Sequence, residues 1–283
     1  MTKVISFVSG KGGVGKTFLT AAFSVCLARA GYRVLAADGD MGLRNLDLAF
    51  GLEEKAGRTI WDLARGQCFK REAVLPVMDR LDFLPAAPDA DWKDISRPAV
   101  ETVFDDLEGQ YDYVLIDCPA GMGKGIRFAR SISDLFILVA VPSRASRRDA
   151  MRMHEILGGM PCRFLLNRFS KKTIPLFLDV CEFLGRSRFG GVIPENETAA
   201  RLGEEGKITS YDSSSNFGKA LEMAVKTMLG EAEYPRSAWQ DLIGTGEDGL
   251  QKETTEPAGN EPAVTRLRRR QSRMAGRWKW KGR

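Results

Sequence analysis

The sequence predicts an α/β fold: a mostly parallel, doubly wound β-sheet with helices on both of its faces. Apolar segments of four to eight residues alternate along the chain with helix-length amphipathic stretches. The apolar segments show no strict alternation of apolar and polar residues, which is typical of parallel strands covered on both faces. In sheets of this kind, ligands bind at the carboxyl ends of the strands.

The elements follow in a regular order along the chain. The clearest helix is Gly15–Ala30, which Gly31 ends. One predicted stripe of this helix carries Leu19, Ala22, Phe23, Cys26, Leu27 and Ala30. The strands are predicted at Val4–Val8, Arg33–Ala37, Leu81–Leu84, Tyr113–Ile116, Leu135–Val141, Arg163–Leu166 and Gly191–Ile193.

The length and composition are those of an ordinary globular chain. Its 283 residues are enough for one large α/β domain or two small ones. The content of 43% apolar and 28% charged residues excludes wholesale disorder. The longest uninterrupted apolar run, Leu135–Val141, is too short to cross a bilayer. The first residues show no signal-peptide pattern, so we expect neither a membrane span nor a leader.

The cysteines and the single histidine do not indicate a metal site. Five cysteines are scattered without a Cys-x-x-Cys pair, which indicates reduced thiols rather than a disulfide frame, a zinc site or an iron–sulfur site. Nothing near His154 supports a metal site or a catalytic triad, and we expect this residue on or near a helix surface.

The strongest chemical signal is a glycine-rich loop between the first strand and the first helix. It fits the pattern G-x-x-x-x-G-K-[ST] in the required context, which predicts a P-loop NTPase fold. Glycines let backbone N–H groups converge on a phosphate, and the helix N-terminus adds its positive end. We expect Lys16 to bridge the β- and γ-phosphates and the Thr17 hydroxyl to ligate Mg²⁺. The loop comprises Gly10, Lys11, Gly12, Gly13, Val14, Gly15, Lys16 and Thr17.

Two further strand ends supply carboxylates for a metal. Asp38 and Asp40 follow the second strand. Asp117 follows the apolar strand Tyr113–Ile116, which is the pattern of a Walker B element. We expect Asp117 to hold Mg²⁺ through a water molecule and the Gly121 N–H to sense the γ-phosphate.

A second lysine, Lys11, makes the loop resemble the deviant Walker A motif of the MinD/ParA family of dimerising ATPases. Residues 42–48, Gly-Leu-Arg-Asn-Leu-Asp-Leu, are more similar to the MinD branch, the bacterial septum-site-determining ATPases, than to ParA. The resemblance extends over residues 1–232 and implies that ATP and Mg²⁺ are the ligands. Further matching segments are Asp117-Cys-Pro-Ala-Gly121, Pro142 with Arg148-Asp149, and Val192-Ile193-Pro194-Glu195.

The resemblance implies roles in hydrolysis. Members of the family form a nucleotide sandwich dimer in which this lysine reaches the partner's phosphates, where a cation would act as an arginine finger does. The resemblance implies that Asp40 orients the attacking water and that Asp38 lies near the metal. The implied catalytic residues are Lys11, Lys16 and Asp40, and the implied metal-site residues are Thr17, Asp38 and Asp117.

The resemblance also implies contacts with the rest of the nucleotide. Asn167 would lie against the adenine edge, where an amide can both donate and accept hydrogen bonds, and Pro194 would lie beside the base. Phe18 stands where the family commonly has a second threonine, so only backbone donors would hold the α-phosphate there.

The end of the chain differs in composition from the rest. Residues 231–263 carry eight acidic and two basic residues, which predicts a flexible acidic linker over 233–263. Residues 264–283 carry nine Lys or Arg and no acidic residue, with apolar residues on one face of a predicted helix. Such a helix suits an anionic membrane surface. Nucleic-acid binding is the second interpretation, and a basic tail without a specific partner is the third.

The sequence therefore predicts three parts: an ATPase domain over 1–232, the linker, and the basic amphipathic tail 264–283. The resemblance and the tail together imply a dimerising switch in division-site placement, cytoplasmic and bound peripherally to the inner face of the cell membrane. Regulatory or division proteins would be its further partners. Two alternatives stay open: a ParA-like DNA-partition ATPase, and a nucleotide-binding regulator of flagellar placement with little turnover.

Overall fold

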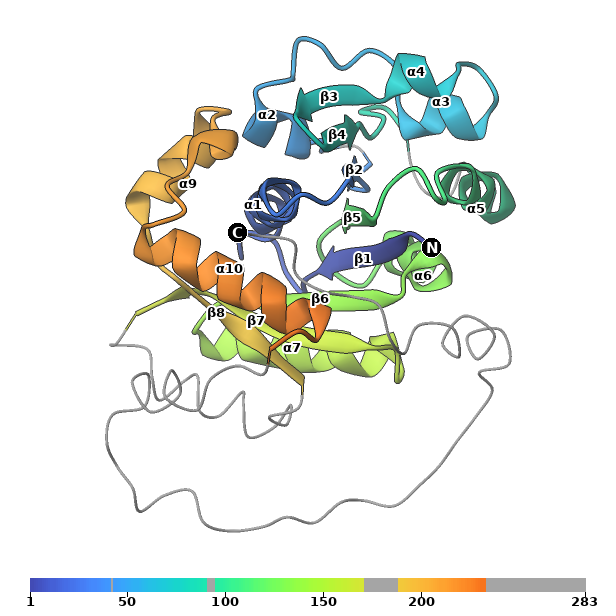
Figure 1. Ribbon diagram of the computed structural model, residues 1–283. Helices are drawn as coiled ribbons and strands as arrows, with labels where there is room; N and C mark the ends of the chain where they lie inside the picture. Colours follow the sequence, from blue (N-terminus) through green and yellow to red (C-terminus); the bar gives the residue numbers. More distant parts are fainter. Residues whose placement is uncertain (42, 91–94, 171–187, 233–283) are drawn as a thin grey trace, which may run out of the picture.

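The computed structural model describes residues 1–41, 43–90, 95–170 and 188–232, and one eight-stranded sheet runs through them (Figure 1). The predicted linker 233–263 and tail 264–283 lie outside the described residues. The strands are β1 (Lys3–Val8), β2 (Val34–Asp38), β3 (Leu75–Met78), β4 (Leu81–Leu84), β5 (Tyr113–Asp117), β6 (Leu135–Ala140), β7 (Cys162–Phe169) and β8 (Phe189–Pro194). The helices are α1 (Lys16–Arg29), α2 (Leu46–Phe50), α3 (Ile60–Ala64), α4 (Lys70–Ala73), α5 (Arg97–Asp106), α6 (Lys124–Ile132), α7 (Arg144–Leu157), α9 (Glu197–Glu204), the 3₁₀ turn η3 (Ile208–Ser210) and α10 (Asn216–Leu229).

The strand order across the sheet is β3-β4-β2-β5-β1-β6-β7-β8, and all neighbours pair in parallel except β3 and β4. Two buried clusters lie on the two faces. Ile5 and Phe7 of β1 point to the face that α1, α2 and α10 cover, and Val4 and Val8 point to the face that α5, α6 and α7 cover (Figure 1). The predicted mostly parallel sheet with helices on both faces is confirmed.

Helix α1 matches its predicted bounds, with Gly15 before its first residue and Ala30 after its last. The buried surface of α1 extends beyond the predicted apolar stripe. Residues outside that stripe, among them Ala21, Ser24 and Val25, are buried as well. Helices α2 and α10 and the turn η3 all contact α1, so the helix is enclosed between them and the sheet. The helix that opens from the glycine-rich loop is therefore part of the core.

The sequence prediction missed strand β3. This strand has four residues with Pro76 among them, and a proline in a short apolar run argues against a strand. The structure places it at the sheet edge, where an absent N–H costs little, and pairs it antiparallel with β4 through Asp79 and Arg80. Arg80 adopts a φ of 63°, which closes this tight hairpin.

The remaining sequence predictions concern isolated residues and membrane spans. His154 lies half-buried on α7, as expected. Within the described ranges, the cysteines Cys26, Cys68, Cys118 and Cys162 are unpaired. Among the described helices, none combines the length and the apolar composition needed to cross a membrane.

The enclosure of α1 can be tested with Val25→Ala. Val25 is fully buried, although it lies opposite the predicted stripe, so the substitution should lower the free energy of unfolding by about 2 kcal/mol. The matched control is Val77→Ala on the edge strand β3, where the half-buried side chain should contribute clearly less. Urea unfolding followed by circular dichroism measures both, and equal small losses would contradict a core position for the outer side of α1.

Candidate functional site

The glycine-rich loop joins β1 to α1 with an open backbone turn. Gly13 and Gly15 adopt φ angles of 79° and 85°, a region that favours glycine. The first backbone N–H groups of an α-helix have no acceptor within the helix, and no side-chain hydrogen bond caps those of α1. A Cβ atom on Gly10 would lie 2.3 Å from the backbone oxygen of Asp149, so α7 packs directly against the loop. The loop thus presents backbone donors from a fixed position.

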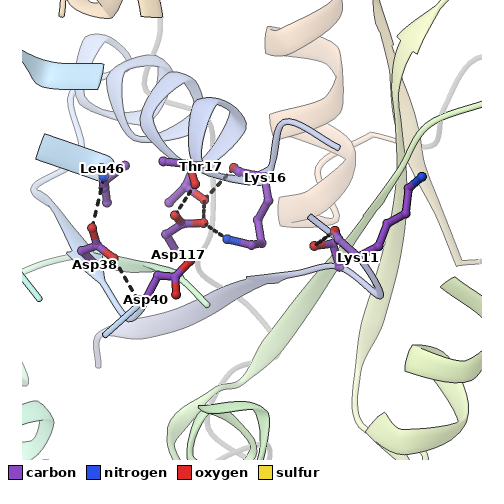
Figure 2. Close-up of polar contacts among 9 residues, drawn as sticks. Lys11, Lys16, Thr17, Asp38, Asp40, Leu46 and Asp117 are labelled. Carbon is purple, nitrogen blue, oxygen red and sulfur yellow. Dashed lines mark hydrogen bonds and ion pairs between the residues drawn. The ribbon is translucent and has the colours of Figure 1, made fainter. Parts of the chain in front are cut away.

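A buried ion pair joins this loop to β5. Lys16 Nζ lies 2.6 Å from Asp117 Oδ1, and the two side chains are 6% and 0% exposed. The Thr17 hydroxyl donates to the other oxygen, Asp117 Oδ2, at 2.6 Å (Figure 2). Burial by itself would lower the pKa of Lys16, but the charge of Asp117 and their hydrogen bond raise it above its ordinary value. The ammonium therefore stays charged inside the protein.

Two more carboxylates lie beside this pair. Asp38 pairs with Asp117 in the register of β2 and β5. Its carboxylate accepts hydrogen bonds from the backbone N–H groups of Asp40 and Leu46, at 2.8 and 3.1 Å, and so anchors the loop that follows β2. Burial and the charge of Asp117 raise the pKa of Asp38. Burial also raises the pKa of Asp40, although Lys16 acts against it.

Asn167 contacts the glycine-rich loop directly. From β7, its Nδ2 donates to the backbone oxygen of Val14 at 2.8 Å. A Cβ atom on Gly15 would lie 2.4 Å from the same Nδ2, so a larger residue at position 15 would displace the amide. Asn167 is 4% exposed. In this structure the side chain implied for adenine recognition positions the phosphate-binding loop.

The side chain of Lys11 extends in a different direction from those of the other candidate site residues. It points away from Lys16 and from the three carboxylates (Figure 2). The backbone oxygen of Lys11 accepts a hydrogen bond from the Ser9 hydroxyl at 2.9 Å, which fixes the loop while the side chain extends outward. Its ammonium is thus directed out of its own site.

The three remaining candidate residues, Phe18, Gly121 and Pro194, each have a different environment. The Phe18 ring packs 5.6 Å from the ring of Phe217 on α10, so only its backbone can serve the site. The Gly121 N–H donates to the Ser9 oxygen at 3.0 Å, and contact with a phosphate would require this hydrogen bond to open. Pro194 ends β8, the strand beside β7.

Sequence reasoning missed three contributors. The hydroxyl of Thr20 donates to the Lys16 backbone oxygen at 3.0 Å and lies 3.4 Å from Asp117 Oδ1. Thr20 follows Lys16 by four residues, so the sequence could have predicted that the two lie on the same face of the helix. The contacts of Ser9 with Gly121 and of Asp149 with Gly10 join distant segments, and no local pattern marks them.

These residues fit a magnesium nucleotide. The hydroxyl of Thr17 and the carboxylate of Asp117 lie close enough to serve one cation, and both are oxygen ligands of the kind that Mg²⁺ prefers. Lys16 and the free N–H groups of α1 are donors for phosphate. In the described part of the chain, no cluster of three or more His, Cys, Asp or Glu residues could hold a metal by itself. Mg²⁺ commonly binds in this way, through few protein ligands together with phosphates.

Comparison with known proteins agrees with this geometry. The CobQ/CobB/MinD/ParA nucleotide binding domain matches residues 5–209. The chain is similar to the septum site-determining protein MinD of Escherichia coli, with 32% identity over 250 residues that cover 82% of this chain and 92% of that protein. It is similar to MinD of Bacillus subtilis, with 30% identity over 243 residues that cover 82% and 91%.

Solved structures show the same relation. A chain of the MinC:MinD cell division protein complex of Aquifex aeolicus matches with a TM-score of 0.74 and 30% identity, over 83% of this chain and 98% of that one. MinD of Pyrococcus horikoshii, complexed with Mg-ADP, matches with a TM-score of 0.70 and 32% identity, over 80% and 95%. A plasmid partition protein of Borrelia burgdorferi bound to AMPPNP shares the fold at 21% identity, with a TM-score of 0.69 over 82% and 100%.

The buried pair can be tested with Asp117→Asn. This change leaves the Lys16 ammonium buried without its counter-charge, so the free energy of unfolding should fall by about 3–5 kcal/mol. The control is Glu101→Gln, which removes the carboxylate of the exposed pair with Arg97 and should cost less than about 1 kcal/mol. Urea unfolding without nucleotide measures both, and a small loss in Asp117→Asn would mean that Lys16 is not held by this pair.

Proposed function

The chain belongs to the MinD branch of the CobQ/CobB/MinD/ParA family of nucleotide-binding domains, and from this premise we propose that it is a Mg²⁺-dependent ATPase that dimerises on ATP and acts as a spatial switch in division-site placement. The observation that carries the proposal is that Lys16 and Thr17, which directly follow the last glycine of the loop, both contact the carboxylate of Asp117. This arrangement supports the proposal, because a cation suited to phosphate and oxygens suited to Mg²⁺ lie next to each other.

The residues of the site divide the chemistry between them. Lys16 and the N–H groups of α1 would bind the phosphates, while Thr17 and Asp117 would hold Mg²⁺, which neutralises charge on the β- and γ-phosphates. Asp40 follows the strand end that Asp38 anchors, and its raised pKa suits a carboxylate that orients water and accepts its proton. Asn167 would keep the loop in its binding shape through the Val14 oxygen.

Dimerisation would complete this site. The outward direction of Lys11 supports a role in a second subunit's site, because the side chain leaves its own phosphate-binding region (Figure 2). The exposed apolar side chains of Leu43, Leu48 and Met122 belong to the segments that follow β2 and β5, at the carboxyl ends of these two parallel strands. Their exposure supports a covering partner, either a second copy of this chain or a division protein such as the MinC of the Aquifex aeolicus complex.

Membrane association would depend on the tail 264–283, which lies outside the described residues. Its nine basic residues and the apolar face of its predicted helix support weak binding to an anionic surface. Two tails carried by one ATP-bound dimer would bind far more tightly than one, through effective concentration. ATP would then move the protein between the cytoplasm and the inner face of the cell membrane.

A ParA-like role in DNA partition is the second candidate, and one observation favours it. Helices α6 and α7 expose several arginines on the same face of the sheet, and Arg130 of α6 reaches Gly158 at the end of α7. Such a surface would contact DNA phosphates without reading sequence. The exposed arginines are Arg127, Arg130, Arg144, Arg148 and Arg152.

The role of Lys11 can be tested with Lys11→Ala. If the lysine acts in the partner's site, the variant should bind ATP with a Kd close to that of the wild type but lose dimer formation on ATP and all stimulation of hydrolysis by anionic vesicles. The matched control is Lys219→Ala, which removes an exposed lysine of α10. It should change neither dimer formation on ATP nor the stimulation of hydrolysis by vesicles. Light scattering reports dimers and phosphate release reports turnover. Wild-type dimers with no turnover, even on vesicles, would instead favour the flagellar-placement regulator.

The role of the tail can be tested with a chain that ends at Gly259. With ATP, the full chain should sediment with vesicles containing anionic lipid, and the shortened chain should stay in solution because it lacks the basic helix. Binding of random-sequence DNA, measured in parallel by gel shift, separates the two candidates. ATP-dependent DNA binding without vesicle binding would favour partition, and vesicle binding that does not depend on ATP would contradict the switch.

A further inference from the structure

Phe18, the third residue of α1, packs its half-buried ring against both α9 and α10. The ring lies 5.6 Å from the ring of Phe217 on α10. On α9, a Cβ atom added to Gly203 would lie 2.7 Å from Phe18 Cδ2 and 3.2 Å from its Cε2. Both helices lie beside α1 (Figure 1). The helix that opens from the glycine-rich loop is thus joined to α9 by one aromatic side chain.

Gly203 lies in the last turn of α9, where its presence is explained by the neighbouring ring. Glycine is a poorer helix former than alanine, so helix formation alone does not favour it. Its backbone does not adopt the positive φ at which glycine is preferred. What Gly203 provides is space, because a methyl group at this position would force either the ring of Phe18 or α9 to move.

Helix α9 begins directly after the end of β8. Pro194 is the last residue of β8, and the side chain of Asn196 caps the first turn of α9. Between them, the Glu195 N–H donates to the backbone oxygen of Phe169 on β7 at 3.0 Å. The turn formed by residues 194–196 is therefore fixed to the sheet at one end, while the direction of α9 determines where its other end lies.

The sheet order places this turn on the side where the nucleoside of a bound nucleotide would lie. The carboxylates of Asp38 and Asp117, which suit the metal, come from β2 and β5, on one side of β1. Strands β7 and β8 lie on the other side, and Asn167 of β7 contacts the loop through the Val14 oxygen. Because the metal binds the terminal phosphates, the nucleoside extends toward β7 and β8.

We infer that Phe18 is a positioning residue for the nucleoside: its ring fixes α9, and α9 holds the turn 194–196 beside the base. Gly203 belongs to the same contact, because a residue without a side chain leaves room for the ring. The inference rests on the proposed function, since it concerns the nucleotide that the glycine-rich loop would bind. Phe18 acts through α9, and its effect concerns the base rather than the phosphates.

A methyl group at position 203 should therefore separate nucleoside binding from phosphate binding. In the free protein, α9 can shift outward and make room for the methyl group. Binding of the base then requires α9 to return against the ring of Phe18, so the cost of this overpacking appears in the affinity for the nucleotide. A ligand with phosphates but no base does not require that return.

Calorimetric titration of the full chain with Mg²⁺ tests this separation, with ADP and inorganic pyrophosphate as ligands because neither is turned over as ATP would be. Gly203→Ala should weaken ADP binding by about tenfold or more and leave the Kd of pyrophosphate unchanged. The matched control is Gly57→Ala, at an exposed glycine where an added Cβ atom meets nothing within 4 Å. It should change neither Kd.

A double-mutant cycle connects the effect to the ring. Phe18→Ala removes the support of α9, so the affinity for ADP relative to pyrophosphate should fall by about tenfold as well. In this background Gly203→Ala meets no ring and should cause no further loss, which makes the two substitutions strongly non-additive. If Gly203→Ala does not fold by itself, Phe18→Ala still provides the comparison of the two ligands.

Three results would overturn the inference while leaving the proposed function intact. These are an unchanged affinity for ADP in the variants, an equal loss for ADP and pyrophosphate, and additive effects of the two substitutions. A wild-type chain that does not bind ADP with Mg²⁺ would instead overturn the proposed function, and this inference with it.

Discussion

The buried contact between Lys16 and Asp117 is the interaction on which the site depends. It joins the first residue of α1 to the last residue of β5, and Thr17, Thr20 and Asp38 are arranged around the same carboxylate. Taking both charges out of water is costly, and only their close approach offsets that cost. A phosphate that draws Lys16 away would leave the oxygens of Asp117 and Thr17 without their ammonium partner and available to a metal cation. Because Lys16 and Asp117 compensate each other, phosphate and metal are expected to bind together.

The loops around this pair are held by side chains that bind backbone atoms. Asp38 fixes the loop after β2 through two N–H groups, and Asn167 fixes the glycine-rich loop through the Val14 oxygen. The Gly121 N–H is bound to the Ser9 oxygen in the same way. Internal hydrogen bonds of this kind keep the loops in shape without a ligand, and binding would exchange some of them for contacts with the nucleotide. The net gain from each exchange is therefore smaller than the strength of one isolated contact.

Local patterns predicted the fold class, seven strands, α1 and the phosphate-binding loop, because the signals lie within a few residues of each other. Strand β3 escaped because Pro76 is tolerated only at an edge, and edges are decided by the whole sheet. The enclosure of α1, the Phe18–Phe217 contact and the Asn167 bond to Val14 join segments that are far apart in the chain. No window of sequence contains both partners. The resemblance named the candidate residues of the site, whose roles stay predictions, while the fold determined the directions of their side chains.

The two ends of the sheet have opposite electrostatic character, and both follow from how strands begin and end. At the carboxyl ends, three carboxylates surround one lysine, so acidic groups outnumber cations in this group, which suits the Mg²⁺ of the proposed function. At the amino ends, the cations Lys3, Arg163 and Arg188 outnumber the carboxylates of Asp134 and Glu231. The carboxylates of Asp134 and Glu231 act on Lys3 and favour its charged form, so the fold itself accounts for a cation at this position.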